Sequence, residues 1–450
     1  MRESRRTGIY WAMWPYHPDL LARPVPRYTS YPTAVEFHDD VGAQAQGRAI
    51  AAATGSVSLY LHIPYCDQIC WYCGCNTGAA NKTHRLTSYL DALDGEVDLV
   101  AGMLTKGTPI SRIAFGGGSP NAIVPLAFVR LLDRVMTAFG AASPEISVEI
   151  DPRGLSAEWV RVLGATGVTH VSMGVQTLSP EIQARIGRVQ PQQMIADACA
   201  DLREVGLGSI NFDLMYGLPG QALDDLTETL DATIKMAPDR IALFGYAHVP
   251  HMLPRQRRID ASALPDQAAR FAMAAAGYEQ LTAAGYVPVG FDHFALPHDT
   301  MARAVADGSL RRNFQGFTDD QAEVLLGMGA SAISNFPDLI IQNEKNAGRY
   351  RMLTSAGKLT GERGVWRSAE DRVRAMIIED ILCHRPADIS GLASDPALMT
   401  GLAPFIAHGL IQYDGDILSP TAHTRPYARA IAVLFDRYRS TSAKTFSSAI

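Results

Sequence analysis

Hydrophobic and polar positions along this chain follow two alternating periods, which predicts strands and helices in regular succession. Short runs rich in apolar and β-branched residues are typical of buried strands. We expect such strands at residues 57–63, 112–115, 146–150, 170–175, 209–215 and 240–246. Amphipathic stretches between the runs predict helices at residues 86–103, 126–139, 157–164, 194–205 and 223–236.

Strands that alternate with helices favour a parallel sheet with right-handed crossovers. The expected fold class is therefore α/β, with a curved sheet or a partial (βα)6 barrel over residues 56–255. Residues 1–55 form an N-terminal extension in this prediction, and residues 256–450 form a mainly helical C-terminal domain that covers the barrel mouth. The boundary is placed where Pro250, Pro254 and Pro265 surround a basic Arg-Gln-Arg-Arg run.

Composition narrows the class of protein. The chain of 450 residues has 40 basic and 46 acidic side chains, and a net charge of -6 gives no general attraction to nucleic acid. No apolar run reaches the roughly 18 residues that a membrane span needs. The N-terminus carries no continuous apolar stretch typical of an export signal, so we expect a cytoplasmic protein with free thiols.

Four of the six cysteines lie within ten residues, directly after the first expected strand. Cys66, Cys70 and Cys73 have the spacing C-x3-C-x2-C, and Cys75 follows after one glycine. Thiolates are soft ligands that suit iron–sulfur clusters and zinc, so this loop predicts a metal centre. Cys75 is either a further ligand or a neighbour. The isolated Cys199 and Cys383 are predicted to be core thiols.

A glycine run follows the second expected strand. Gly116, Gly117 and Gly118 precede Ser119, and such a run either brings backbone amides close to a ligand or makes a tight turn. The position of the run, one strand after the cysteine loop, favours a ligand-binding role.

The compact cysteine triple, with Tyr72 before its third member, resembles the cluster loop of radical S-adenosylmethionine (SAM) enzymes. Further motifs carry a narrower resemblance, to the oxygen-independent coproporphyrinogen III oxidases, from about Pro26 to the C-terminus. These motifs are Pro26-Arg-Tyr-Thr-Ser-Tyr-Pro-Thr33, Cys73-Gly-Cys75-Asn76, Val148-Glu-Ile-Asp-Pro-Arg153, Ser172-Met-Gly-Val-Gln176, Asn211-Phe-Asp-Leu-Met-Tyr-Gly-Leu-Pro219, Tyr246-Ala-His248, Asp292-His-Phe-Ala295, Arg312-Asn-Phe-Gln-Gly316 and Gly327-Met-Gly-Ala-Ser-Ala-Ile-Ser334.

The resemblance implies a [4Fe–4S] cluster on Cys66, Cys70 and Cys73, with Cys75 nearby but not ligating. It also implies two molecules of SAM. The residues expected around the first are Tyr60, Gly117, Glu149 and Ile333. Those expected around the second are Tyr72, Gly118, Ser119, Gln176, Arg188, Asp213 and Ala247. Carboxylates can hold ammonium or hydroxyl groups and arginine can hold a carboxylate, although an acidic residue at a strand end can instead cap a helix.

The implied reaction is the conversion of two propionates of coproporphyrinogen III to vinyl groups by a 5'-deoxyadenosyl radical. The implied partners are this substrate and a low-potential reductant such as flavodoxin or ferredoxin, and the implied assembly is a monomer. His62 and His248 are candidate proton relays or orienting groups. Side chains that could hold propionates are Arg27, Arg257, Arg258, Arg311 and Arg312. The tail 446–450 lacks the arginine usual in the family.

Other functions stay open on sequence alone. A haem-binding chaperone and a haem-processing radical SAM paralogue share the scaffold, but such relatives typically lack Cys75 and the block from Arg27 to Thr33. A zinc site or a plain electron-transfer cluster is compatible with the cysteines, although the motifs between Gly117 and Asp213 favour an enzyme.

Overall fold

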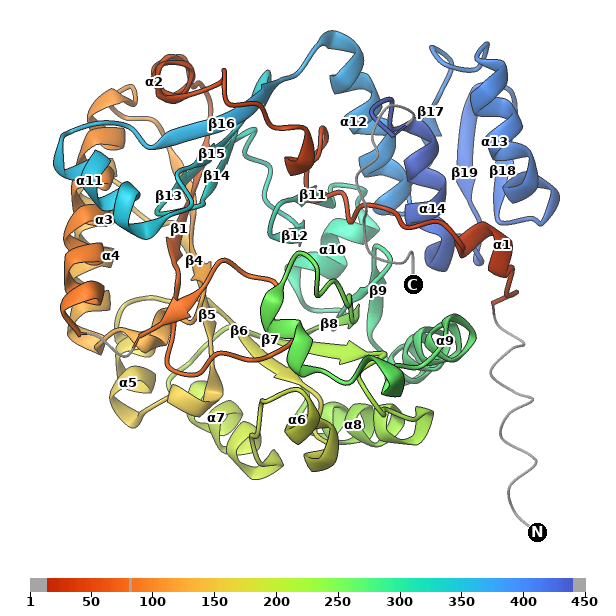
Figure 1. The fold of residues 1–450 in the computed structure, drawn as a ribbon, viewed down its shortest axis with the longest axis horizontal. Helices are drawn as coiled ribbons and strands as arrows, with labels where there is room; N and C mark the ends of the chain where they lie inside the picture. The colour runs from red at the N-terminus through yellow and green to blue at the C-terminus, as the bar shows by residue number, and fades with distance from the viewer. Residues whose placement is uncertain (1–13, 81–82, 440–450) are drawn as a thin grey trace.

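The computed structural model describes residues 14–80 and 83–439, and one curved sheet organises them (Figure 1). The sheet has twelve strands in the order β16-β15-β14-β13-β1-β4-β5-β6-β7-β8-β10-β9. Its central strands are β1 (Val57–Ile63), β4 (Ile110–Gly117), β5 (Glu145–Ile150), β6 (His170–Gln176), β7 (Ser209–Tyr216) and β8 (Arg240–Gly245). These six strands run parallel, as the alternating pattern predicts.

Helices cover the outer side of the parallel strands (Figure 1). They are α3 (Thr83–Met103), α4 (Pro125–Phe139), α5 (Ala157–Ala165), α6 (Pro180–Arg185), α7 (Gln192–Glu204) and α8 (Leu223–Met236). The short helix α6 is absent from the sequence prediction, because six residues give too little periodicity to recognise. The sheet ends in two separate edge strands, β16 and β9, so the barrel is partial, which confirms the predicted fold class.

The later part of the chain extends both ends of this sheet. On one side β13 (Val324–Met328) pairs in parallel with β1, and β14 (Ile333–Asn335), β15 (Leu339–Asn343) and β16 (Gly361–Trp366) follow in antiparallel pairing. On the other side, β10 (His293–Ala295) pairs with β8, and β9 (Val287–Val289) forms the edge. The predicted units 56–255 and 256–450 thus share one sheet, and their boundary stays a prediction.

Among the remaining elements, α9 packs against α8 and α11 packs against α3, so these two helices continue the outer layer (Figure 1). The helices are α9 (Gln267–Ala283), α10 (Thr300–Ala306), α11 (Ala347–Ser355), α12 (Ala369–Leu382), α13 (Pro396–Ala407) and α14 (Ala428–Ala432). Two small sheets accompany them, made of β11 (Arg311–Asn313) with β12 (Gly316–Thr318), and of β17 (Ala387–Asp388), β18 (Ile411–Tyr413) and β19 (Ile417–Pro420). Helical residues outnumber strand residues in this part of the chain.

The N-terminal segment runs across the open side of the ring, from α1 (Pro18–Leu21) to α2 (Ala43–Ala51) (Figure 1). The Tyr28 hydroxyl donates to the Asp436 carboxylate at 2.9 Å, and the Gln46 amide donates to the Asn343 side chain at 3.0 Å. The segment therefore joins the C-terminal helices to the sheet. No helix of the described residues has the length and apolar character to cross a membrane.

Candidate functional site

The cysteine loop leaves the carboxyl end of β1. Cys66 lies in the short strand β2 (Tyr65–Cys66), which pairs in parallel with β3 (Gly78–Ala79) and so closes the loop that holds Cys70, Cys73 and Cys75. Parallel strands bring their carboxyl ends to one rim, where active sites of such barrels lie. The loop therefore faces the ends of β4 to β8, as the strand order requires.

Donors from separate elements reach the sulfur atoms of the cysteine triple. The Ser119 hydroxyl lies 3.6 Å from Cys66 Sγ. Cys70 Sγ accepts from the guanidinium groups of Arg153 and Arg188 at 3.3 Å and 3.2 Å. Hydrogen bonds to ligand sulfurs are a usual means of tuning iron–sulfur clusters, so this donor set fits thiolates that carry a cluster.

Cys73 and Cys75 form a pair with unequal chemistry. The Cys75 backbone N–H donates to Cys73 Sγ at 3.4 Å. Hydrogen bonding from Cys75 lowers the pKa of Cys73 to about 6, whereas burial raises the pKa of Cys66 to about 11. Cys75 thus acts as a donor to Cys73 in this arrangement. Cys199 and Cys383 are buried core thiols, as predicted.

A single zinc ion and a four-iron cluster require different arrangements of their cysteine ligands. A single zinc ion needs several ligands converging on one point, and the described ranges 14–80 and 83–439 hold no cluster of His, Cys, Asp and Glu side chains with that geometry. A four-iron cluster places each thiolate on a different iron, so its ligands stand further apart. The hydrogen bonds that Cys66, Cys70 and Cys73 receive at their sulfurs fit thiolates that carry a [4Fe–4S] group.

The glycine run packs directly against the cysteine loop. Gly118 donates its N–H to the Ile63 carbonyl at 2.8 Å, and Ser119 donates to the Tyr65 carbonyl at 2.7 Å. A Cβ on Gly118 would lie 2.3 Å from the Tyr65 oxygen, which leaves no room for a side chain. Gly117 has φ +105, a backbone conformation that favours glycine. The run is therefore required for close approach of two backbones.

Two acidic side chains, Glu149 and Asp213, lie on β5 and β7 of the sheet. Glu149, on β5, accepts from the Gly117 N–H at 3.0 Å, and its carboxyl is open to the hollow but surrounded by protein. This desolvation raises the pKa of Glu149 to about 7, and the nearby Asp213 carboxylate adds to the shift. Asp213 accepts from Asn211 at 2.8 Å and from Ser172 at 3.2 Å, and burial raises its pKa. Neither carboxylate caps a helix.

Arg188 lies among groups that orient it. Its guanidinium pairs with Asp151 at 3.2 Å and donates through Nε to the Gly174 carbonyl at 3.1 Å. Burial opposes its charge, but Tyr72 and Asp151 raise the pKa of Arg188, so it stays cationic. The side chains of Gln176 and Arg188 both lie next to Gly174, because a Cβ added at this glycine would be 3.0 Å from each of them. Gln176 itself has φ +66.

Tyr60 and Ile333, the remaining residues expected around the first SAM, lie on β1 and β14 of the same sheet. The Tyr60 hydroxyl lies 3.0 Å from His62 Nδ1, and burial lowers the pKa of His62 to about 4. Tyr60 is also opposite Gly327 of β13. A Cβ on Gly327 would meet the Ile333 carbonyl at 2.4 Å, so Tyr60 and Ile333 flank the same glycine.

Tyr72 and Ala247 are linked by a residue that the sequence does not reveal. The side-chain amide of the buried Gln256 donates to the Tyr72 carbonyl at 2.8 Å and to the Ala247 carbonyl at 3.0 Å. Its oxygen accepts from the Val249 N–H at 2.6 Å. Gln256 stands in the basic run that suggested a domain boundary, and no pattern distinguishes it there from a surface residue.

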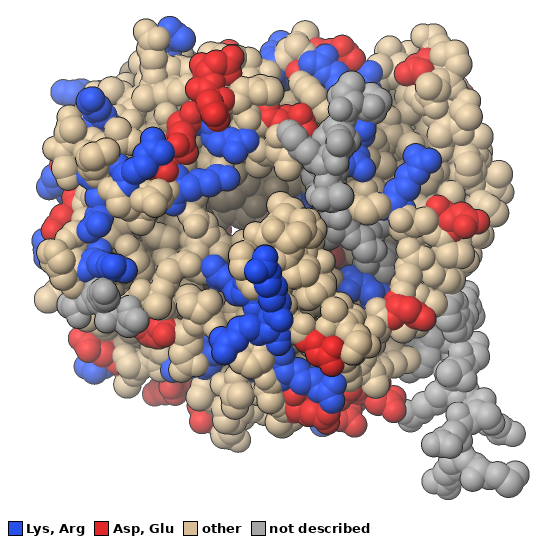
Figure 2. Space-filling model, in the orientation of Figure 1, with Lys and Arg blue, Asp and Glu red and all other residues tan. Residues whose placement is uncertain are grey.

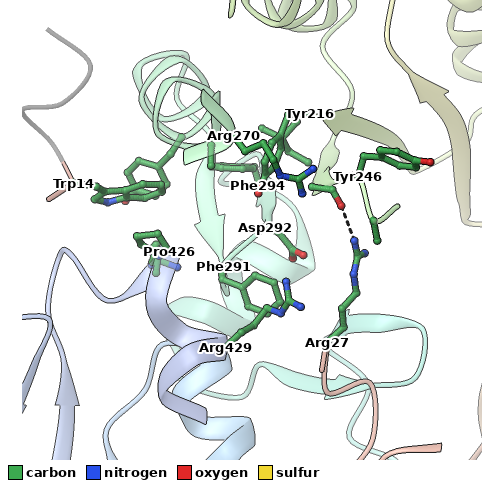
Figure 3. A pocket seen from close by; sticks show the side chains of 16 residues that line it. Trp14, Arg27, Tyr216, Tyr246, Arg270, Phe291, Asp292, Phe294, Pro426 and Arg429 are labelled. Atoms are coloured by element: carbon green, nitrogen blue, oxygen red, sulfur yellow. Dashed lines mark hydrogen bonds between the residues drawn. The ribbon is translucent and has the colours of Figure 1, made fainter. Parts of the chain in front are cut away.

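The arginines expected to hold propionates separate into three groups. Arg27 lines a cavity beside the end of β8 (Figure 3), and Arg311 and Arg312 line a second cavity. Arg258 stacks on the Trp71 ring at 4.7 Å, and Arg257 lies exposed beside it. Figure 2 shows a hollow near the middle of this face with basic side chains around it. The tail 446–450 lies outside the described residues.

His248 contacts the Tyr246 hydroxyl through Nδ1 at 2.9 Å, and burial lowers its pKa. Most of the expected residues thus lie on strands of the sheet or in the loops that follow them, next to the cysteine loop. Their individual roles in binding SAM stay predictions.

A cysteine loop at the carboxyl rim of a partial parallel barrel, next to a glycine run and inner carboxylates, defines a radical SAM protein. The model of the radical SAM superfamily matches residues 60–233. An oxygen-independent coproporphyrinogen III oxidase from Bradyrhizobium diazoefficiens is 41% identical over 95% of this chain and 97% of its own length. The relative of that name from Escherichia coli is 35% identical over 93% of this chain and 94% of its own length.

A solved structure of coproporphyrinogen III oxidase from Escherichia coli, described as a radical SAM enzyme, superposes with a TM-score of 0.88. It is 34% identical and covers 95% of this chain and 100% of its own. The chain belongs to the family of oxygen-independent coproporphyrinogen III oxidases, which confirms the resemblance drawn from its motifs.

Proposed function

We propose that this protein converts the propionates of rings A and B of coproporphyrinogen III to vinyl groups without oxygen, giving protoporphyrinogen IX in haem biosynthesis. The observation that carries the proposal is the triple of Cys66, Cys70 and Cys73, whose sulfurs receive hydrogen bonds from Ser119, Arg153, Arg188 and Cys75 at the barrel rim. The relatives named as this oxidase, similar over nearly the whole chain, support the substrate.

When bound, the cluster and SAM supply a 5'-deoxyadenosyl radical that takes one hydrogen atom from the β-carbon of a propionate. The carboxylate then leaves as carbon dioxide, and one electron passes to an acceptor, so that a vinyl group remains. The chain has to position these groups and keep water away from them. The walls around Glu149, Asp213 and Arg188 supply the polar contacts for that task.

We also propose that two SAM molecules bind, as the family resemblance implies. Glu149 beside Gly117, with Tyr60 and Ile333, would hold the first against the open iron. The second would lie among Arg188, Gln176 and Asp213, with Gly118 and Ser119 at the loop and Tyr72 and Ala247 joined by Gln256. An ammonium group suits the carboxylates, and a carboxylate suits the Arg188 fork.

The proposal includes a monomer that receives electrons from a low-potential reductant such as flavodoxin or ferredoxin. It places the protein in the cytoplasm, because all six cysteines are free in the structure and a reducing compartment preserves them. The names of the relatives do not favour a haem-binding chaperone or a haem-processing paralogue.

Anaerobic reconstitution tests the function. The protein is loaded with iron and sulfide, reduced, and supplied with SAM and coproporphyrinogen III. We expect 5'-deoxyadenosine together with a divinyl product, at two molecules of the nucleoside for each product. Cleavage of SAM without decarboxylation would point to another tetrapyrrole substrate, and a protein that holds only zinc would contradict the radical mechanism.

A further inference from the structure

Two side chains of α3 reach the backbone turn 329–332, which joins β13 to β14. Tyr89 and Glu96 lie roughly two helical turns apart on α3, so they project from one face of the helix, and both are fully buried. The Gly329 N–H donates to the Glu96 carboxylate at 2.6 Å, and the Ala330 N–H donates to the Tyr89 hydroxyl at 2.9 Å. One helix therefore holds two consecutive amides of the turn.

The Glu96 carboxylate also holds the elements that follow this turn. It accepts from the Asn343 amide at 3.0 Å, the Tyr350 hydroxyl at 2.7 Å and the Thr360 hydroxyl at 2.6 Å. A buried carboxylate is tolerated where such donors replace water, and its hydrogen bonds are stronger than those between neutral groups. Glu96 thus ties the turn to β15, to α11 and to the segment before β16.

The Tyr89 hydroxyl connects the turn to the strand that leads into the cysteine loop. It accepts from Ala330 and donates to the His62 carbonyl, near the end of β1, at 2.7 Å. The Tyr89 ring also meets the Tyr65 ring edge to face, with 5.4 Å between their centres, and Tyr65 directly precedes Cys66. One hydroxyl therefore bridges the turn 329–332 and the backbone next to the first cysteine.

The conformation of the turn depends on its surroundings. Gly329 has φ +101, and a Cβ there would lie 2.5 Å from the His62 carbonyl oxygen and 2.8 Å from the Tyr89 hydroxyl. Ser331 has φ +66, which is uncommon for a residue other than glycine, and its N–H donates to the Glu344 carbonyl at 2.9 Å. Such a backbone persists where neighbouring contacts hold it in place.

The turn leads directly to residues expected around the first SAM. The Ser331 hydroxyl lies 3.4 Å from His62 Nε2, and the Tyr60 hydroxyl lies 3.0 Å from Nδ1 of the same ring. Ile333 follows as the first residue of β14. A displacement of the turn would therefore move Ile333 and change the contacts of His62, which lies beside Tyr60.

We propose that Tyr89 and Glu96 are positioning residues for the first SAM, because they hold the turn 329–332 in the conformation that presents Ser331 and Ile333. This inference rests on the proposed function, which places SAM beside Ile333. Where the turn is released, only a fraction of the molecules has the binding-competent arrangement, and the apparent affinity for SAM falls by that fraction. The free energy of one buried hydrogen bond is enough for a change of about fivefold.

Tyr89→Phe tests the inference, and Tyr286→Phe is its matched control. The buried Tyr286 also donates its hydroxyl to a backbone carbonyl at 2.7 Å, that of Pro238, and it lies next to the edge strand β9. Each substitution removes one buried hydroxyl, so both should lower the melting temperature by a similar amount. A change in SAM affinity in Tyr89→Phe alone would therefore separate positioning from a general loss of stability.

The measurement uses the full chain, reconstituted with iron and sulfide, reduced, and titrated with SAM in the absence of coproporphyrinogen III. The readout is the change that SAM causes in the electron paramagnetic resonance spectrum of the cluster, because it reports the SAM molecule at the open iron and not the second one. We expect Tyr89→Phe to need about fivefold more SAM for half of this change, with iron content unchanged. Tyr286→Phe should titrate like the wild type.

Glu96→Gln is the second variant, and it leaves the contact between Tyr89 and the end of β1 in place. Each carboxylate oxygen of Glu96 accepts two hydrogen bonds, so the amide nitrogen of glutamine would face two donors in either orientation. We expect weaker SAM binding here as well. If Tyr89→Phe does not assemble the cluster, this variant decides, and an unchanged titration would then overturn the inference.

Equal SAM titrations of Tyr89→Phe and Tyr286→Phe would overturn the inference, and an unchanged titration of Glu96→Gln would remove Glu96 from it. A wild type whose cluster spectrum does not respond to SAM would contradict the proposed function as well. A protein that forms the divinyl product while Tyr89→Phe binds SAM like the wild type retains the proposed function and loses only this positioning role.

Discussion

The side-chain amide of Gln256 donates a hydrogen bond to the backbone carbonyl of Tyr72 at 2.8 Å, and this contact joins the cysteine loop to the segment that follows β8. The same amide group also reaches the Ala247 carbonyl. One buried side chain therefore joins Tyr72 and Ala247, two residues expected at the second SAM site, through their backbone carbonyls.

We expect Gln256→Leu to weaken SAM binding by about tenfold and to lower the free energy of unfolding by about 1–3 kcal/mol, because buried carbonyls lose their donor. Gln256→Glu keeps the size and the acceptor for Val249, but turns an oxygen toward two carbonyls, so it should be at least as harmful. Equilibrium binding of SAM and chemical denaturation measure both effects. Gln193→Leu, on the exposed side of α7, is the control and should change neither.

A side chain at Gly118 should prevent cluster assembly. In Gly118→Ala the Cβ would meet the Tyr65 carbonyl oxygen at 2.3 Å and the Ile63 oxygen at 2.8 Å, so the backbone next to Cys66 would have to move. We expect iron content after reconstitution to fall by more than half. Gly95→Ala is the matched control, because nothing lies within 4 Å of its Cβ on α3. That change should stabilise the helix by about 0.5–1 kcal/mol and leave iron content unchanged. Full loading of Gly118→Ala would disprove the close-approach argument.

The cysteines should divide into three ligands and one neighbour. Substitution of Cys66, Cys70 or Cys73 by serine should abolish both cluster absorbance and SAM cleavage, because three thiolates are the minimum for this type of cluster. Cys75→Ser should keep the cluster, since Cys75 donates to the Cys73 sulfur through its backbone N–H. Iron and sulfide analysis and absorbance spectra show which of the variants still hold the cluster. Loss of the cluster in Cys75→Ser alone would make it a ligand.

Glu149 should give the metal-free protein a specific pH dependence. Its pKa is raised from 4.5 to about 7 in the folded chain, mainly by desolvation, so the folded state binds a proton more tightly than the unfolded state does. The contribution to stability is therefore complete below pH 4.5 and is lost as pH rises through 7. As pH rises from about 5 to 8, the melting temperature of the wild type should fall relative to that of Glu149→Gln.

Thermal unfolding of the two proteins across that range measures the difference, and the comparison removes the titration of all other groups. Glu158→Gln, exposed on α5, provides the reference for loss of one acidic charge. A constant difference between wild type and Glu149→Gln from pH 5 to pH 8 would contradict the raised pKa.

Local patterns were enough to predict the parallel core. The strand at residues 57–63 is predicted with its observed bounds, because all its residues are buried and most of them are apolar. The cysteine spacing and the glycine run likewise carry their signal within a few residues. Contacts between distant segments leave no such signal, so the pairing of β1 with β13 could not be predicted from periodicity.

The same limit applies to the candidate site. Tyr89 and Glu96 lie on a helix whose sequence gives no sign that either side chain reaches the turn after β13. Their shared position depends on how α3 packs against a segment that is distant in the sequence. Ile333 could be proposed because it belongs to a recognisable motif, whereas the side chains that hold its turn could not.

The parallel pairing of β1 with β13 has a consequence for assembly of the enzyme in the cell. As the ribosome releases the chain, the strand that precedes the cysteines finds β4 early but lacks its other neighbour until Val324–Met328 has been made. Until then one edge of β1 is open to any strand nearby, which is a known route to aggregation. A fragment that stops after residue 255 lacks β13 and would keep that edge open permanently.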